Sequence, residues 1–356
     1  MPRKPILLFL CAFWSLLPKS APAATLSEDL NSVVVYAYFQ IGTAEDYASD
    51  LSIDAFQAQI DEITTGGYNV LSLKDVLGAQ STGQSLPPKS IVLTFETFDT
   101  NFMKDALPLL DKNHLPFVLI LSAAKLDDVE KKGVGPSWDD VRPLLKNSLV
   151  EIGMTPYLYA PEHIQSAEDL KLSINRAKAR FREKLDFEPP YFSYPFGEYS
   201  PAYRAIASNF AAALTQTSGV MSSQTDKTLV PRFTMTDGFS DIDRFRMTSL
   251  ALPFPVIDPT PDRVYWKENP PILEFSVDQR ITKGDLSKMD CFASGVSGLT
   301  KDIRYTPDET QVAIHIPAPF EDGKGRVNCT IPVLSPDGDP DAVRWRWAGF
   351  QFNFAE

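Results

Sequence analysis

The stretch Ile91-Val92-Leu93-Thr94-Phe95-Glu96-Thr97-Phe98 decides the fold of this chain. It begins as a short run of apolar and β-branched residues, which is typical of a buried strand in a parallel sheet. A carboxylate, Glu96, follows at the carboxyl end of the run, and a polar loop then leads into a helix predicted over 101–112. Because α/β proteins place their functional side chains at the carboxyl ends of such strands, Glu96 is the first candidate site residue.

Apolar strands alternate with amphipathic helices on both sides of this stretch. Further strands are predicted over Ser32–Phe39, Tyr68–Leu73, Pro116–Leu121, Leu149–Gly153, Tyr191–Tyr194, Ala211–Thr215 and Leu229–Phe233. The longest of the intervening helices is predicted over Ser166–Leu185. This alternation implies an α/β fold, and about seven strand–helix units favour a distorted (β/α) barrel over an open sheet.

A proline-rich stretch divides the chain into two predicted domains. Residues 251–271 contain six prolines and are predicted to be a linker that follows an α/β domain at 24–250. Residues 272–356 are predicted to be a small C-terminal all-β module of the sandwich type, because their strand-like runs show no helical period. These runs are Ile272–Val277, Gln311–Ile316, Arg326–Ile331 and Arg344–Phe354.

The first 23 residues have the composition of a secretory signal peptide. Arg3 and Lys4 precede an apolar run of about a dozen residues, which is too short to span a bilayer comfortably, and Ala21-Pro22-Ala23 offers a cleavage site. We therefore expect residues 1–23 to be removed and the protein to be exported, either to the periplasm or out of the cell; an uncleaved anchor is the alternative interpretation of this segment. No membrane span is predicted in the mature chain.

Charge and cysteine content narrow the function classes further. The formal net charge is −12 and no block of Lys and Arg occurs, which argues against nucleic acid or an anionic membrane as partner. A neutral or cationic ligand is compatible with this charge. Cys291 and Cys329 would be the two cysteines of the mature chain, so we expect them to form a disulfide in an oxidising compartment.

The usual catalytic motifs are missing from the sequence. The three histidines, His114, His163 and His315, form no H-x-x-x-H or H-E-x-x-H pair, and no C-x-x-C occurs, so none of the common zinc spacings is present. There is also no G-x-S-x-G turn and no glycine-rich phosphate loop. The residues alone therefore predict an exported α/β domain with an acidic strand end.

The order of several motifs, however, resembles that of the polysaccharide deacetylases of carbohydrate esterase family four, in particular the exported ones that act on poly-N-acetylglucosamine. The matching segments are Val35-Tyr36-Ala37-Tyr38-Phe39 (family Y-H-R-F), Phe56 to Leu73 with Gly66-Gly67-Tyr68, Leu93 to Thr97 (T-F-D-D), Glu151-Ile152-Gly153, Phe192 to Tyr199 (Y-P-Y-G-E-Y) and Val230-Pro231-Arg232-Phe233 (L-P-R). The C-terminal module, including Trp345-Arg346-Trp347, is similar to an appendage of some exported members. The resemblance covers nearly all of the chain after residue 23 and implies a distorted barrel of the polysaccharide deacetylase type.

The resemblance also implies a reaction, but this chain departs from the family at the reacting positions. Family members remove acetyl groups from N-acetylated sugars with a divalent metal such as zinc, held by an aspartate and two histidines. Glu96 stands at the position of the general base, whereas Thr97, Thr155 and Tyr159 stand at the three metal-ligand positions. Since neutral hydroxyls are poor ligands for such an ion, we expect no bound metal and no cofactor.

Three interpretations of the site follow. The first is a groove that binds an N-acetylated glycan polymer with lost or weakened deacetylase activity, for which the candidate substrate-binding residues are Phe98, Tyr157, Tyr159, Pro195, Phe196 and Tyr199. The second is an active hydrolase of carbon–nitrogen bonds through an altered site, for example Glu96 with Asp99 and His163 around a metal. The third is a non-catalytic scaffold that works with polysaccharide synthesis or export proteins.

Overall fold

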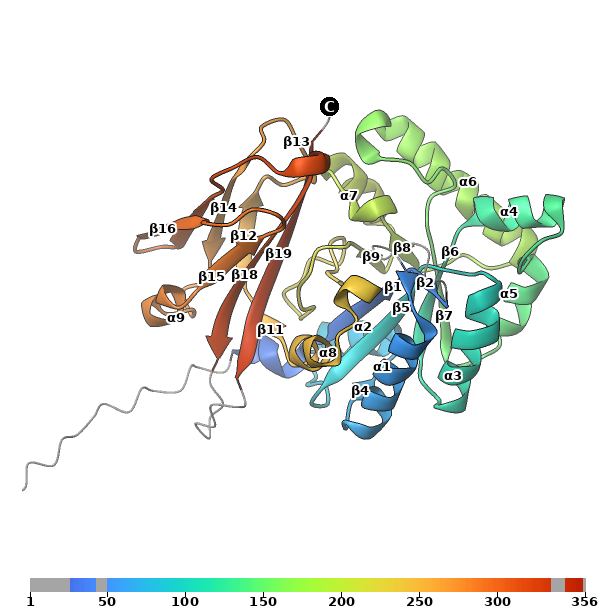
Figure 1. Ribbon diagram of the computed structural model, residues 1–356. Coiled ribbons are helices and arrows are strands. Elements are labelled where there is room, and N and C mark those ends of the chain that lie inside the picture. Colours follow the sequence, from blue (N-terminus) through green and yellow to red (C-terminus); the bar gives the residue numbers. More distant parts are fainter. Residues whose placement is uncertain (1–25, 43–49, 334–342, 355–356) are drawn as a thin grey trace, which may run out of the picture.

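The structure is a computed structural model that describes residues 26–42, 50–333 and 343–354. The signal peptide predicted at 1–23 lies outside the described residues. Within them, no helix is long and apolar enough to cross a membrane. Two units lie side by side, an α/β barrel and a β-sandwich, and the long strands β18 and β19 of the sandwich stand on the side next to the barrel (Figure 1).

The barrel is built on one sheet of parallel strands in the order β10-β1-β5-β6-β7-β8-β9, with β4 paired to β5. Its strands are β1 (Val34–Tyr38), β4 (Asn69–Val70), β5 (Ser90–Phe95), β6 (Phe117–Leu121), β7 (Val150–Met154), β8 (Tyr191–Ser193), β9 (Ala212–Leu214) and β10 (Phe233–Met235). The two edges of the sheet meet, because Val230 bridges Leu214 of β9 while β10 pairs with β1. The predicted distorted barrel is therefore confirmed.

Alternating residues of the strands fill two apolar cores, as the pleat of a strand requires. In β5, Ile91, Leu93 and Phe95 face the helices that surround the sheet. Val92 faces the interior of the barrel, where it packs with residues such as Val35 and Val118. The same alternation carries Thr94 and Glu96 into the interior at the carboxyl end of β5.

Helices cover the outside of the sheet. They are α1 (Ile53–Thr65), α2 (Leu73–Thr82), α3 (Leu107–Lys112), α4 (Ala123–Lys132), α5 (Trp138–Leu144), α6 (Ala167–Leu185), α7 (Pro201–Ala207) and α8 (Ile242–Ser249), with short turns η2 to η5 and a small strand pair, β2 (Gln40–Ile41) and β3 (Asp50–Leu51), between them. The helix predicted over 101–112 begins as a π-helical turn, η2 (Phe102–Ala106), before α3. The long helix predicted over 166–185 is confirmed as α6, which begins after the cap residue Ser166.

The C-terminal unit consists of two packed sheets, which confirms the predicted all-β module. One sheet has the order β11-β19-β18-β15 with β13 beside β19, and the other has the order β12-β14-β17-β16. The strands are β11 (Leu252–Pro253), β12 (Val256–Thr260), β13 (Tyr265–Trp266), β14 (Ile272–Val277), β15 (Asp290–Ala293), β16 (Thr300–Tyr305), β17 (Thr310–His315), β18 (Lys324–Val333) and β19 (Arg344–Phe354), with the short helices α9 (Lys283–Ser287) and η6 (Glu321–Gly323). Cys291 of β15 and Cys329 of β18 lie opposite each other and form the predicted disulfide.

The stretch expected to be a linker, 251–271, is built into this sandwich. Its strands β11 and β13 pair with β19, and β12 pairs with β14. Proline lacks the amide hydrogen that a central strand needs, but edge strands and bulges accept it. Pro253 lies in the two-residue edge strand β11, and Pro259 lies where the β12–β14 register shifts. The prolines therefore do not prevent this stretch from pairing.

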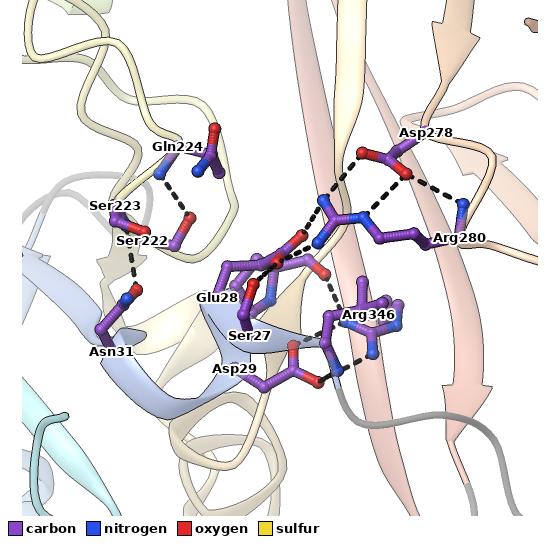
Figure 2. Close-up of polar contacts among 12 residues, drawn as sticks. Ser27, Glu28, Asp29, Asn31, Ser222, Ser223, Gln224, Asp278, Arg280 and Arg346 are labelled. Atoms are coloured by element: carbon purple, nitrogen blue, oxygen red, sulfur yellow. Dashed lines mark hydrogen bonds and ion pairs between the residues drawn. The ribbon is translucent and has the colours of Figure 1, made fainter. Parts of the chain in front are cut away.

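A short 3₁₀ helix, η1 (Ser27–Asn31), connects the start of the barrel with the sandwich. Its Glu28 accepts two hydrogen bonds from Arg280, at 2.8 and 2.9 Å, and its Asp29 accepts two from Arg346, at 2.7 and 2.9 Å. Figure 2 shows both carboxylates pointing at the guanidinium groups of the sandwich, while Asn31 contacts Ser223 of the barrel. Such paired, two-bond contacts hold both the distance and the orientation of the partners.

Strand β19 has one face on each unit. Trp347 packs edge-to-face on Phe233 of the barrel, with ring centroids 5.3 Å apart, whereas Phe350 and Phe352 belong to the core of the sandwich. On the barrel side, Gln351 donates to the Phe196 carbonyl and Asn353 donates to Glu198. The sandwich is thus packed against the loop that follows β8, at the edge where the barrel strands end.

Candidate functional site

Glu96 occupies the interior of the barrel beyond the end of β5. Its side chain is only 4% exposed, and its Oε2 accepts hydrogen bonds from the Ser193 hydroxyl and from Arg232 Nη2, both at 2.9 Å. Ser193 ends β8, so the carboxylate is held by groups from two strand ends and from the segment before β10. The tertiary structure therefore places Glu96 where the sequence predicted a site.

Arg232 is the organising cation of this site. Its side chain is fully buried, and its guanidinium also donates to Thr94 Oγ1 at 3.2 Å and to the Thr215 carbonyl at 2.7 Å. Arg232 belongs to the L-P-R segment of the resemblance, and the sequence did not predict it as a site residue. Its sequence context does contain a signal. Arg232 lies between Val230 and Phe233, which both belong to the apolar cores, and a charged residue buried in such a place needs a partner.

A cavity of about 710 Å³ opens at these strand ends, within the range of small-molecule sites. Glu96, Thr155 and Thr234 are among the residues that line it. Glu96 Oε1, Thr155 Oγ1 and Thr234 Oγ1 are buried and make no hydrogen bond with any residue that the structure describes. Since an unsatisfied buried polar atom costs about 1–3 kcal/mol, these three atoms in one cavity are available to water or to a hydrogen-bonding ligand.

Three of the predicted substrate-binding residues, Phe98, Tyr159 and Phe196, line this cavity. The rings of Tyr159 and Phe196 meet edge-to-face with centroids 4.9 Å apart, and the Phe196 amide donates to the Tyr159 hydroxyl at 3.3 Å. Both side chains are exposed, at 40% and 38%, so they can receive a ligand. Their arrangement forms an aromatic edge beside the buried polar atoms.

The other three predicted residues do not line the cavity. Tyr157 donates to Asp127 at 3.0 Å and carries the Arg176 guanidinium 3.7 Å above its ring. Pro195 is buried at the start of the turn η4 (Pro195–Gly197). Tyr199 packs beside Tyr194 against the core of the barrel.

The residues at the family's metal-ligand positions do not fit a divalent ion. Thr97 donates its hydroxyl to Asp99 at 3.0 Å, Tyr159 accepts from the backbone, and Thr155 has no hydrogen-bond partner in the described chain. These are three neutral hydroxyls, whereas such ions select carboxylate and imidazole donors. The positively charged guanidinium of Arg232 is paired with Glu96, and it would repel a metal ion bound next to this carboxylate.

The alternative metal site of Glu96, Asp99 and His163 is not assembled either. Asp99 accepts the Thr97 hydroxyl and the Phe102 amide at the start of η2, and the His163 ring packs on Tyr265 at 4.0 Å. No group of three or more His, Cys, Asp or Glu residues that could hold a metal is found over 26–42, 50–333 and 343–354. Each of these side chains thus has a structural contact of its own.

Two cations line the cavity that the sequence did not point to, Lys125 at the start of α4 and Arg326 on β18. Arg326 comes from the sandwich, so both units contribute to the wall of the cavity. Nothing in the sequence signals this role, because Arg326 was predicted only as the first residue of a strand in a separate module.

Residues 83–214 match the family model described as polysaccharide deacetylase. Similar solved structures are a Streptococcus pyogenes deacetylase, PplD, in complex with acetate (16% identity, 61% of this chain and 98% of that one, TM-score 0.54), a de-N-acetylase from Aggregatibacter actinomycetemcomitans (19%, 60% and 99%, 0.53) and IcaB from Ammonifex degensii (19%, 61% and 97%, 0.52). A search of curated protein sequences gave no significant match. The resemblance inferred from the motifs is therefore confirmed, and the neighbours establish the fold.

Proposed function

We propose that this chain is an exported protein of carbohydrate metabolism that binds an N-acetylated glycan on its polysaccharide deacetylase domain, with deacetylation lost or weakened. The observation that carries the proposal is the cavity with three buried polar atoms that lack partners and a border of exposed aromatic rings. The hydroxyl and acetamide groups of a sugar could form hydrogen bonds with these polar atoms, and its apolar C–H faces could pack on the aromatic rings. The match over 83–214 and the similarity to IcaB favour an exopolysaccharide or cell-envelope glycan as ligand.

Export is supported by the composition of residues 1–23 and by the Cys291–Cys329 disulfide, which forms in oxidising compartments. Loss or weakening of the reaction is supported by the hydroxyl side chains of Thr97, Thr155 and Tyr159 at the ligand positions. Export and loss of the reaction are tested separately from glycan binding. Fractionation of the native host tests export by locating the protein, and metal analysis of the purified protein tests the loss of the metal site by counting bound ions.

The binding proposal is tested by calorimetric titration with N-acetylglucosamine oligomers. Tyr159→Ala should weaken binding about tenfold, because it removes an aromatic contact. Tyr305→Ala on β16 of the sandwich is the matched control, since it removes an exposed tyrosine outside the cavity lining. If the wild-type chain binds no oligomer, the proposal that it binds an N-acetylated glycan fails.

Glu96 favours a second candidate, residual hydrolysis, because its Oε1 is buried without a hydrogen-bond partner in the described chain and belongs to a residue of the cavity wall. A carboxylate in that position can accept a proton from water. Acetate release from the same oligomers, abolished by Glu96→Gln while oligomer binding persists, would establish this candidate. Equal background release from wild type and Glu96→Gln would exclude it.

A further inference from the structure

Arg326 reaches from β18 of the sandwich to the cavity of the barrel. Its Nη1 donates to the Gln216 carbonyl at 2.9 Å, in the loop after β9, and it faces Gln351 across the β18–β19 pair. Gln351 in turn donates to the carbonyl of Phe196, which lines the same cavity. The Gln216 carbonyl of the barrel therefore holds the guanidinium of Arg326, and the neighbouring Gln351 connects the same part of the sandwich to the aromatic edge.

No carboxylate in the described chain pairs with Arg326. Two other buried arginines, Arg232 and Arg346, each pair with a carboxylate, Glu96 and Asp29 respectively. Burial lowers the pKa of Arg326, although an arginine keeps its charge at neutral pH. A half-buried guanidinium with one carbonyl partner has further N–H groups that can bind an anion.

The charges around the cavity leave a local positive excess. The acidic side chains of its lining are Glu96 and Asp99, and the basic ones are Lys125 and Arg326. Glu96 is already neutralised by Arg232, and Asp99 accepts two hydrogen bonds from its own loop. Lys125 is exposed and, like Arg326, pairs with no acid in the described residues. The site is thus locally cationic on a chain whose net charge is −12.

We propose that the glycan bound by this site carries carboxylate groups, as uronic acids do, and that Arg326 binds one of them. This inference rests on the proposed glycan-binding function and names the class of its ligand. A planar carboxylate matches the fork of a guanidinium and accepts two N–H bonds from it, which gives Arg326 both an energetic and an orienting role. Lys125, a point charge on the barrel side, would bind a second or more distant negative group. The sandwich then acts as a specificity wall of the site.

The test compares two trisaccharides on the full mature chain by calorimetry, tri-galacturonate and tri-N-acetylglucosamine. We expect tri-galacturonate to bind about tenfold or more tightly at low salt, and Arg326→Gln to remove that preference while binding of the neutral trisaccharide persists. Arg326→Lys should restore part of the preference because it restores the charge. Arg304→Gln, on the other sheet of the sandwich, is the matched control and should change neither affinity.

The outcomes separate this inference from the proposed function. If the neutral trisaccharide binds as well as or better than the charged one, the carboxylate inference is wrong while glycan binding stands. If tri-galacturonate binds equally well to Arg326→Gln and to wild type, Arg326 is not its partner and the inference is also wrong. If neither trisaccharide binds, both proposals fail. Circular dichroism of each variant checks that it is folded.

Discussion

The guanidinium of Arg232 lies 2.9 Å from Oε2 of Glu96, and the two side chains are 0% and 4% exposed. The pair stands inside the barrel at the end of β5, and Ser193 forms a hydrogen bond with each member. In this interior the attraction between the two charges offsets the loss of their hydration only while both are present. The pair is thus a structural element as well as part of the site.

Arg232→Met should therefore lower the free energy of unfolding by about 3–5 kcal/mol at pH 7, because it leaves a buried carboxylate without its cation. Urea denaturation followed by tryptophan fluorescence measures the change. Arg142→Met is the control, since its ion pair with Asp139 is largely exposed and its loss should leave stability nearly unchanged. Equal effects of the two substitutions would contradict this account of the pair.

Restoring the family's ligands should create a metal site. The combined changes Thr97→Asp, Thr155→His and Tyr159→His supply a carboxylate and two imidazoles at the positions where the resemblance places the ligands. We expect this variant to retain zinc after dialysis, at close to one ion per chain by atomic emission, and wild type to retain far less. Retention of one zinc by wild type, lost in Glu96→Ala, would instead show a metal site that the hydroxyl donors do not explain.

Glu198 gives the stability a specific dependence on pH. Burial raises its pKa above the ordinary value of 4.5, although hydrogen bonds from the Glu162 amide, Tyr265 and Asn353 act in the opposite direction. Because the folded state keeps the proton to higher pH than the unfolded chain, the contribution of Glu198 to stability is full below pH 4.5 and falls as the pH rises through the raised pKa.

The stability of wild type minus that of Glu198→Gln should accordingly decrease between pH 4.5 and pH 7. Paired urea titrations across this range measure the difference, and the variant removes only the titration at this position. A difference that stays constant or grows with pH would show that the hydrogen bonds outweigh burial.

Gly349 lies where β19 approaches the barrel backbone closely. A Cβ at this position would lie 2.4 Å from the Ser218 carbonyl oxygen, which is backbone and cannot move aside easily. Gly349→Ala should therefore destabilise the protein by about 1–3 kcal/mol and weaken any binding that needs Arg326 in place. Gly295→Ala is an informative comparison, because its Cβ would meet no atom within 4 Å and only its backbone conformation, φ +68°, opposes the change.

The disulfide should contribute measurably to stability. It joins residues 38 apart in the sequence, so its loss frees the unfolded chain and should cost about 2–4 kcal/mol. The double variant Cys291→Ala/Cys329→Ala measures this cost, and reduction of wild type with dithiothreitol should lower the denaturation midpoint by a similar amount. An unchanged midpoint after complete reduction would refute the expectation.

Local sequence patterns predicted the elements of the barrel well. The β-branched run before Glu96 became β5, and the periodic segment that follows Ser166 became α6, because burial on a parallel sheet leaves clear apolar patterns. The stretch at 251–271 was expected to be a linker but forms strands. Its prolines lie in edge strands and at a bulge, where the missing amide hydrogen matters little. The sequence did not predict strand β16, because its residues are mostly polar and exposed and show no apolar pattern.

The site was predictable where a strand end or a family motif points to its residues. The strand pattern indicated Glu96 and the family motifs indicated Tyr159 and Phe196, and all three line the cavity. Arg232 lies 136 residues from Glu96 along the chain, and no local pattern reports a contact of that span. Arg326 could not be found at all, because its role depends on how the sandwich packs on the barrel. Whole-chain charge likewise says nothing about the local excess of positive charge in the cavity.

The carboxylates of η1 have a consequence for how the chain becomes a folded protein. Glu28 and Asp29 pair with Arg280 and Arg346, which lie 252 and 317 residues further along the chain. These two contacts therefore close almost the whole described chain into one loop. Contacts of such span form late and slowly, because the chain must first lose the entropy of closing the loop. If the barrel and the sandwich were produced as separate fragments, the carboxylates of η1 and their arginine partners would be left unpaired. The two units should therefore fold in one cooperative transition rather than independently.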